Sequence, residues 1–162
     1  MIILGIDPGT QRMGYGLIEA RGGKASFLEA GIIKVRGRSD SETLPDIKKE
    51  LAGLIQTFKP EVFAIEKLFF VKNQKTGLSV AQARGVAILC ATEMNLEIHE
   101  FSPNEVKIGL TGYGHADKTS VSKMVKLILN RPGLKFGDDA MDALAIAIFA
   151  SQHLALRRNL SN

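Results

Sequence analysis

The chain has 162 residues, 45% of them hydrophobic, and this size and composition predict one globular domain over residues 1–162. No apolar run is long enough to cross a membrane, and no basic leader precedes the first strand-like run, so we expect a cytoplasmic protein without membrane association. The single cysteine, Cys90, excludes an internal disulfide, and the net charge of +4 is compatible with a polyanionic partner without identifying one.

The hydrophobic pattern predicts an α/β fold in which three strands are followed by helices that alternate with two more strands. Glycine-containing connections between the first three strands indicate an antiparallel meander, whereas the later strand–helix–strand order indicates parallel pairing. We therefore expect a mixed five-stranded sheet flanked by helices. The expected strands are 1–7, 12–20, 25–36, a short strand ending at 66, and 96–101; the expected helices are 43–58, 76–94, 103–110, 118–130 and 138–156.

Two acidic residues stand at the ends of apolar strands. Asp7 closes the run 2–6, and Glu66 closes the run 62–65. Carboxylates rarely occupy apolar elements without a partner, and ligands of open α/β sheets gather at the carboxyl ends of the strands. If the two strands are neighbours, we expect these two carboxylates to converge.

Two further acids open the last apolar helix. Asp139 and Asp142 are three residues apart and therefore share one face, and the neighbours of Asp142 are apolar on nearly every side. We assign Asp138 to the helix cap instead. Oxygen donors without cysteine or paired histidine suit Mg²⁺ or Mn²⁺, and such a cluster suits two-metal phosphoryl transfer. His115 could assist proton transfer, but a lone loop histidine is more often solvated.

Several segments together resemble one family. They are GIDPGT at 5–10, GYG at 14–16, FAIE at 63–66, QARGVA at 82–87 and DAMDALA at 139–145. In this order they resemble the RuvC family of bacterial Holliday-junction resolvases. The resemblance implies a ribonuclease H-like fold, a homodimer, paired symmetric nicks in four-way junction DNA, and a branch-migration complex of the RuvA and RuvB type as partner. It also implies that the catalytic metal ligands, for two ions per site, are Asp7, Glu66, Asp139 and Asp142.

The resemblance extends to residues that would bind DNA. Lys107 and Lys118 match lysines that the family uses near the substrate phosphates, and Phe69 matches an aromatic that touches bases at the crossover, with Phe70 as a second candidate. Read from the residues alone, 68–75 places aromatics beside cations, as a surface that stacks bases would. The alternative is that the phenylalanines belong to the core.

Other functions fit parts of the sequence. Residues 7–10 also resemble the phosphate-binding hairpin of actin-like and sugar-kinase ATPases, which need two related domains. A non-catalytic DNA-binding module would keep the cations but need none of the four acids, and a related nuclease of the same fold could act on RNA or RNA–DNA hybrids. The small residues Ala81, Ala83, Gly85 and Ala87 allow close helix packing, either inside the domain or across a dimer interface.

Overall fold

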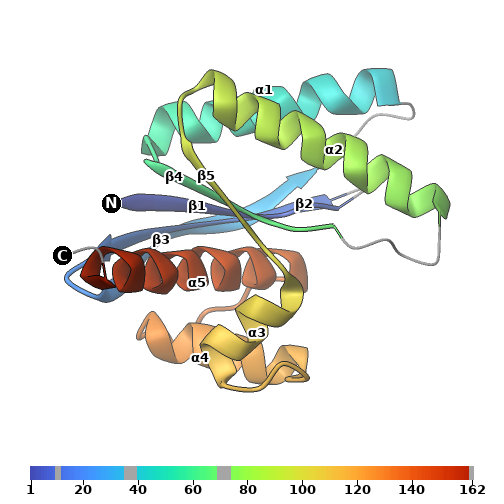
Figure 1. Ribbon diagram of the computed structural model, residues 1–162. Helices are drawn as coiled ribbons and strands as arrows, with labels where there is room; N and C mark the ends of the chain where they lie inside the picture. The colour runs from blue at the N-terminus through green and yellow to red at the C-terminus, as the bar shows by residue number, and fades with distance from the viewer. Residues whose placement is uncertain (10–11, 35–39, 69–73, 161–162) are drawn as a thin grey trace.

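A mixed five-stranded sheet lies between two helical layers in the computed structural model, which describes residues 1–9, 12–34, 40–68 and 74–160 (Figure 1). Neighbouring strands follow the order β3-β2-β1-β4-β5. The first three strands pair antiparallel, and β1–β4 and β4–β5 pair parallel. This architecture confirms the predicted fold class. The strands are β1 (Ile2–Asp7), β2 (Arg12–Arg21), β3 (Lys24–Lys34), β4 (Val62–Glu66) and β5 (Glu97–Phe101).

The first two helices lie on one face of the sheet, and the last helix lies on the other face with the remaining helices packed outside it (Figure 1). The expected helices are all present, and they differ from the prediction mainly at their ends. The last one continues to Leu160, where Arg157 and Arg158 lie in the final turn and complement the helix dipole. The helices are α1 (Asp40–Phe58), α2 (Gln74–Glu93), α3 (Pro103–Thr111), α4 (Lys118–Ile128) and α5 (Asp138–Leu160).

The sheet is buried on both faces because its central strands direct apolar side chains alternately to two cores. On β1, Ile3 packs toward α5, whereas Leu4 and Ile6 pack toward α1 and α2. All three side chains are fully buried. The central strands therefore fix the register and orientation of the acids that follow them.

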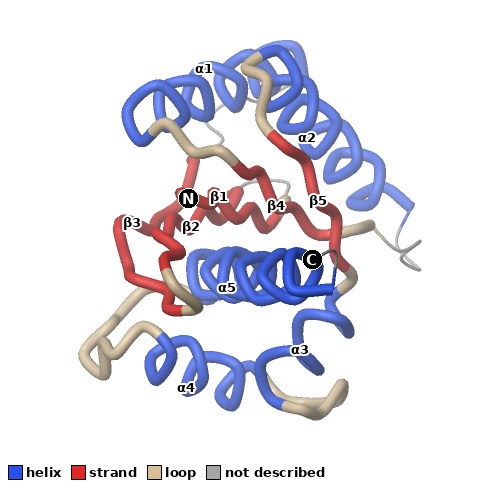
Figure 2. Tube along the Cα trace, turned by 60° about the vertical axis from the view of Figure 1, so that its left-hand side comes forward, coloured by secondary structure: helices blue, strands red, loops and turns tan. Residues whose placement is uncertain are grey.

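Helix α5 is buried on nearly every side because it lies between the sheet and the pair α3 and α4 (Figure 2). Glycine on the sheet allows this close approach. A Cβ at Gly5 would lie 2.2 Å from the carbonyl oxygen of Ala143, and one at Gly16 would lie 2.7 Å from the main-chain nitrogen of Leu144. The helix main chain thus rests directly on β1 and β2.

Local capping explains where α3 and α4 begin. Ser102 and Glu105 form a capping box at the start of α3, with Pro103 directly after the cap. Asp117 caps α4 by accepting a hydrogen bond from the Ser120 main-chain nitrogen at 2.7 Å. These caps set the first turn of each helix, and each helix carries one of the two lysines predicted from the sequence.

Among the described residues, no helix combines the length and the apolar character needed to cross a membrane. The single cysteine is buried on α2, as expected for a small apolar side chain.

Candidate active site

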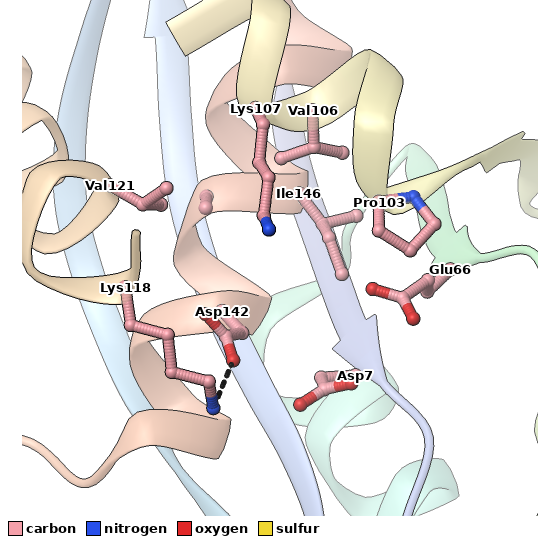
Figure 3. Close-up of a pocket in the computed structure, with 10 residues that line it drawn as sticks. Asp7, Glu66, Pro103, Val106, Lys107, Lys118, Val121, Asp142 and Ile146 are labelled. Carbon is pink, nitrogen blue, oxygen red and sulfur yellow. Dashed lines mark ion pairs between the residues drawn. The ribbon is translucent and has the colours of Figure 1, made fainter. Parts of the chain in front are cut away.

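A pocket of about 320 Å³ opens at the carboxyl ends of β1 and β4. Three acids and two lysines line it together with apolar side chains from α3, α4 and α5. Figure 3 shows the acids and lysines directed toward one space from five separate elements. The pocket-lining residues are Asp7, Glu66, Pro103, Val106, Lys107, Lys118, Val121, Asp142, Ala145 and Ile146.

The two strand-end acids lie together because their strands are parallel neighbours. Ile6 pairs with Ile65, so Asp7 and Glu66 are the next residues on adjacent strands. The predicted convergence of these two carboxylates is confirmed. Since α5 crosses the same sheet edge, it adds Asp142 from a third segment.

Burial raises the pKa of all three pocket carboxylates, and neighbouring acids add to the rise. Burial, reinforced by Glu66 and Asp142, raises the pKa of Asp7 to about 7. Burial and then the charge of Asp142 raise the pKa of Glu66, and burial is also the main cause of the raised pKa of Asp142. Each shift records a cost of holding negative charge in the pocket. A cation bound among these oxygens would relieve that cost.

The two lysines supply positive charge from the opposite wall. The ammonium nitrogen of Lys118 lies 3.3 Å from Asp142 Oδ2 and 3.4 Å from Asp138 Oδ2, and the charge of Asp142 is the main reason that the pKa of Lys118 is raised. Lys107 is half-buried and its charge opposes the rise in the pKa of Glu66. Both predicted lysines are therefore brought to the pocket.

Asp139 does not line the pocket. It is one helical turn closer to the start of α5 than Asp142, and its Oδ2 lies 3.5 Å from Nε of Arg12. Its charge nevertheless contributes to the raised pKa of Asp7. Within the described ranges, no three acidic, cysteine or histidine side chains converge closely enough to hold a metal ion in this arrangement.

Three other sequence-based assignments have different outcomes. Asp138, which the sequence analysis assigns to the helix cap, is the first residue of α5 and an acid of its first turn, and its contact with Lys118 was not predicted. His115 is exposed, stacks edgewise on Tyr113 with 5.6 Å between the ring centres, and is not among the pocket-lining residues. Phe69 and Phe70 lie outside the described residues.

Sequence reasoning missed Arg12 and the apolar wall of the pocket. Arg12 is the first residue of β2, the strand that pairs with β1. Asp7 on β1 stands opposite Gly14, two residues after Arg12, and this pairing is the signal that could have placed Arg12 near the acids. Val106 and Val121 come from α3 and α4. Their place in the pocket depends on how these helices pack, which local sequence patterns do not specify.

The fold and the pocket define a class of protein: a ribonuclease H-like enzyme with acids at the ends of the first and fourth strands and on the last helix. A family model described as crossover junction endodeoxyribonuclease RuvC matches residues 3–150. The chain belongs to this RuvC family, which confirms the resemblance found in the sequence.

Individual relatives agree with this assignment. The crossover junction endodeoxyribonuclease RuvC of Natranaerobius thermophilus is 45% identical over 161 residues, covering 99% of this chain and 100% of that protein. The RuvC of Ruminiclostridium cellulolyticum is 46% identical over 149 residues, with 91% of this chain and 90% of that protein covered. The solved structure of T. thermophilus RuvC in complex with a Holliday junction substrate superposes with a TM-score of 0.90 at 30% identity and covers 97% of this chain and 96% of that one.

Proposed function

We propose that this protein is a crossover junction endodeoxyribonuclease that resolves four-way DNA junctions by paired symmetric nicks. The observation that carries the proposal is the meeting of Asp7, Glu66 and Asp142 opposite Lys107 and Lys118 in one pocket. This combination suits hydrolysis of a phosphodiester, because the lysines attract the phosphate and the acids can bind cations beside it. The four-way junction is proposed as substrate because a solved structure of T. thermophilus RuvC is in complex with a Holliday junction substrate.

We assign Asp7, Glu66, Asp139 and Asp142 as the catalytic acids and as ligands for two Mg²⁺ ions, with Mn²⁺ as a substitute. Hard carboxylate oxygens suit these ions, and burial, with neighbouring acids, raises the pKa of Asp7, Glu66 and Asp142, a cost that a bound cation would offset. Bound there, divalent ions would supply activation of water and neutralisation of charge on the leaving oxygen. Asp139 would join the set by turning away from Arg12.

The chain's own side chains would orient the phosphate. Lys107 is half-buried on α3, while Lys118 is 65% exposed and lies between Asp142 and Asp138. When DNA and metal enter, Lys118 is free to exchange its contact with Asp142 for a phosphate oxygen and still keep Asp138 as a neighbour. Phe69 would stack on a base near the crossover, as the family resemblance implies.

We further propose that the protein acts as a homodimer, since symmetric cutting of a two-fold substrate needs two related sites. The outer face of α2 supports this. Leu78 and Leu89 are 65% and 51% exposed and share this face with the exposed small residues Ala81 and Gly85, whereas Ala83 and Ala87 pack inward. The small residues thus divide between the core and a surface that a second copy could cover. A branch-migration complex of the RuvA and RuvB type, in the cytoplasm, would deliver the junction.

The decisive experiment compares two substrates under the same conditions. A synthetic four-way junction and an RNA–DNA hybrid duplex of matched sequence are incubated with the protein and Mg²⁺ in single-turnover cleavage. We expect nicks in two opposed strands of the junction, sealed by ligase, and little cleavage of the hybrid. Preferential cleavage of the hybrid would assign the protein to the ribonuclease alternative. Junction binding without any cleavage would indicate a non-catalytic module.

A further inference from the structure

Arg84 on α2 is a half-buried arginine that does not line the pocket. Only 17% of its side-chain surface is exposed. Its Nε donates a hydrogen bond to the main-chain carbonyl oxygen of Glu66 at 3.0 Å, and its Nη2 pairs with the carboxylate of Glu100 on β5. One side chain therefore joins α2, the end of β4 and β5 at the residue that carries a pocket carboxylate.

The main chain at Glu66 needs such a restraint because the sheet holds it mainly from one side. Pairing between β1 and β4 ends at Ile65, one residue earlier. On the other side, Glu66 still pairs with Phe101, and the Lys67 nitrogen donates to the Phe101 carbonyl oxygen at 2.8 Å. The bond from Arg84 fixes the carbonyl of Glu66 and with it the plane of the following peptide. This in turn limits the directions in which the Glu66 side chain can leave the strand.

Orientation matters for this carboxylate because its surroundings oppose its charge. Glu66 lines the pocket beside Asp7 and Asp142, and like charges repel, so a loosely held side chain would move away from the other two acids. A main-chain restraint counteracts this movement without adding charge to the pocket.

The contacts of the Arg84 guanidinium group suit a geometric role better than an electrostatic one. Its positive charge is balanced by Glu100, whereas the cations that act on the Glu66 carboxyl group are Lys107 and Lys118. A guanidinium can hold the Glu66 carbonyl and the Glu100 carboxylate at the same time from two different nitrogens. A lysine ammonium, which is a point charge on a flexible stem, cannot reproduce this planar geometry.

We infer that Arg84 is a positioning residue for Glu66: it clamps the end of β4 to α2 and β5 so that the Glu66 carboxylate faces Asp7 and Asp142. The inference rests on the proposed catalytic role of Glu66. Because α2 also carries the exposed apolar face described above, the same clamp connects that face to the pocket through one side chain.

The test uses Arg84→Lys and Arg84→Met in the full-length protein. Arg84→Lys keeps a cation for Glu100 and so preserves folding, but it loses the Nε bond to Glu66. We expect single-turnover junction cleavage to fall about 10- to 100-fold in both variants, since a misplacement near 1 Å costs about that much. Half-maximal cleavage should need more Mg²⁺, while junction binding in Ca²⁺ should stay unchanged. Recovery of wild-type cleavage in Arg84→Lys would overturn the geometric role.

A second readout does not depend on activity. Calorimetric titration with Mn²⁺ in the absence of DNA should show weaker binding for Arg84→Lys than for wild type. In the Glu66→Gln background, Arg84→Lys should weaken Mn²⁺ binding no further, because the orientation of the lost ligand no longer matters. Additive losses would show that Arg84 acts elsewhere and would overturn the inference.

The matched control is Lys48→Met. Lys48 ties α1 to α2 through a 2.8 Å ion pair with Glu93, so its removal loosens α2 without touching β4. Wild-type cleavage and Mn²⁺ binding are expected. Equal losses in Lys48→Met and Arg84→Lys would reduce Arg84 to a structural residue. If Glu66→Gln cleaves normally, the proposed function fails; if Glu66→Gln is inactive and Arg84→Lys is normal, only the positioning role fails.

Discussion

Gly14 on β2 lies directly against the main chain of Asp139 on α5, and a Cβ built at Gly14 would be 2.0 Å from the carbonyl oxygen of Asp139. Real Cβ atoms do not approach main-chain oxygen so closely, so no side chain fits at this position while α5 keeps its place. Gly14 also stands opposite Asp7 in the β1–β2 pairing. A residue without a side chain thus sets the distance between two of the proposed catalytic acids.

The first prediction follows from this contact. Gly14→Ala should push the start of α5 away from the sheet, lower the free energy of unfolding by about 1–3 kcal/mol, and reduce junction cleavage more than junction binding. Urea unfolding and single-turnover cleavage measure the two effects. Gly53→Ala on α1 is the control, because its added Cβ would meet nothing within 4 Å and alanine favours a helix. A Gly14→Ala protein as stable and active as Gly53→Ala would contradict the close contact.

This contact also shows why the sequence predicts some parts of the site and not others. Asp7 and Glu66 end apolar strands, so a local pattern and a general rule about strand ends place them together. The position of Asp139 beside Arg12, by contrast, depends on how far α5 slides along β1 and β2. The pairing of Lys118 with Asp142 depends likewise on how α4 packs against α5. Such tertiary distances leave no periodic signal in the chain.

The second prediction concerns the two lysines. Lys107→Met and Lys118→Met should each slow cleavage and flatten the dependence of log binding constant on log salt by about one unit, since each would remove one phosphate contact. Junction binding is measured by gel shift in Ca²⁺ over a range of salt concentrations. Lys123→Met is the control because Lys123 lies on α4, is exposed and does not line the pocket. If all three variants showed the same salt dependence of binding, Lys107 and Lys118 would not contact phosphates and would be ordinary solvated cations.

The third prediction concerns assembly. Leu89→Asp introduces a charge on the exposed face of α2 and should convert the protein to a monomer in sedimentation velocity. The paired nicks on one junction should then become uncoupled, while metal binding persists. Leu127→Asp on α4 is a matched control, because Leu127 is 72% exposed and lies on a different helix. If both variants sediment as wild type does, α2 is not the interface, and a monomeric wild-type protein with and without junction DNA would reject the dimer itself.

The last prediction tests the acid cluster through stability and activity together. Without divalent ions, the pKa of Asp7 rises from 3.8 in the unfolded chain to about 7 in the folded one, so the folded protein prefers the protonated form. The destabilisation is absent below about pH 4, grows as the unfolded chain ionises first, and is complete above about pH 7, where it amounts to a few kcal/mol at most. Asp7→Asn removes it. In EDTA the variant should therefore exceed wild type in free energy of unfolding at pH 8 and by less at pH 5.

Divalent metal should reverse this order, because Mg²⁺ or Mn²⁺ stabilises only the protein that still has its ligand. Junction cleavage by Asp7→Asn should fall by several orders of magnitude while binding in Ca²⁺ survives. Glu66→Gln, Asp139→Asn and Asp142→Asn should lose cleavage in the same way. Asp138→Asn is the internal control: it removes an exposed neighbour of Lys118 and should keep near-normal cleavage. Full activity in Asp7→Asn would exclude the two-metal proposal, and an inactive Asp138→Asn would mean that the helix contributes a different acid from the one assigned.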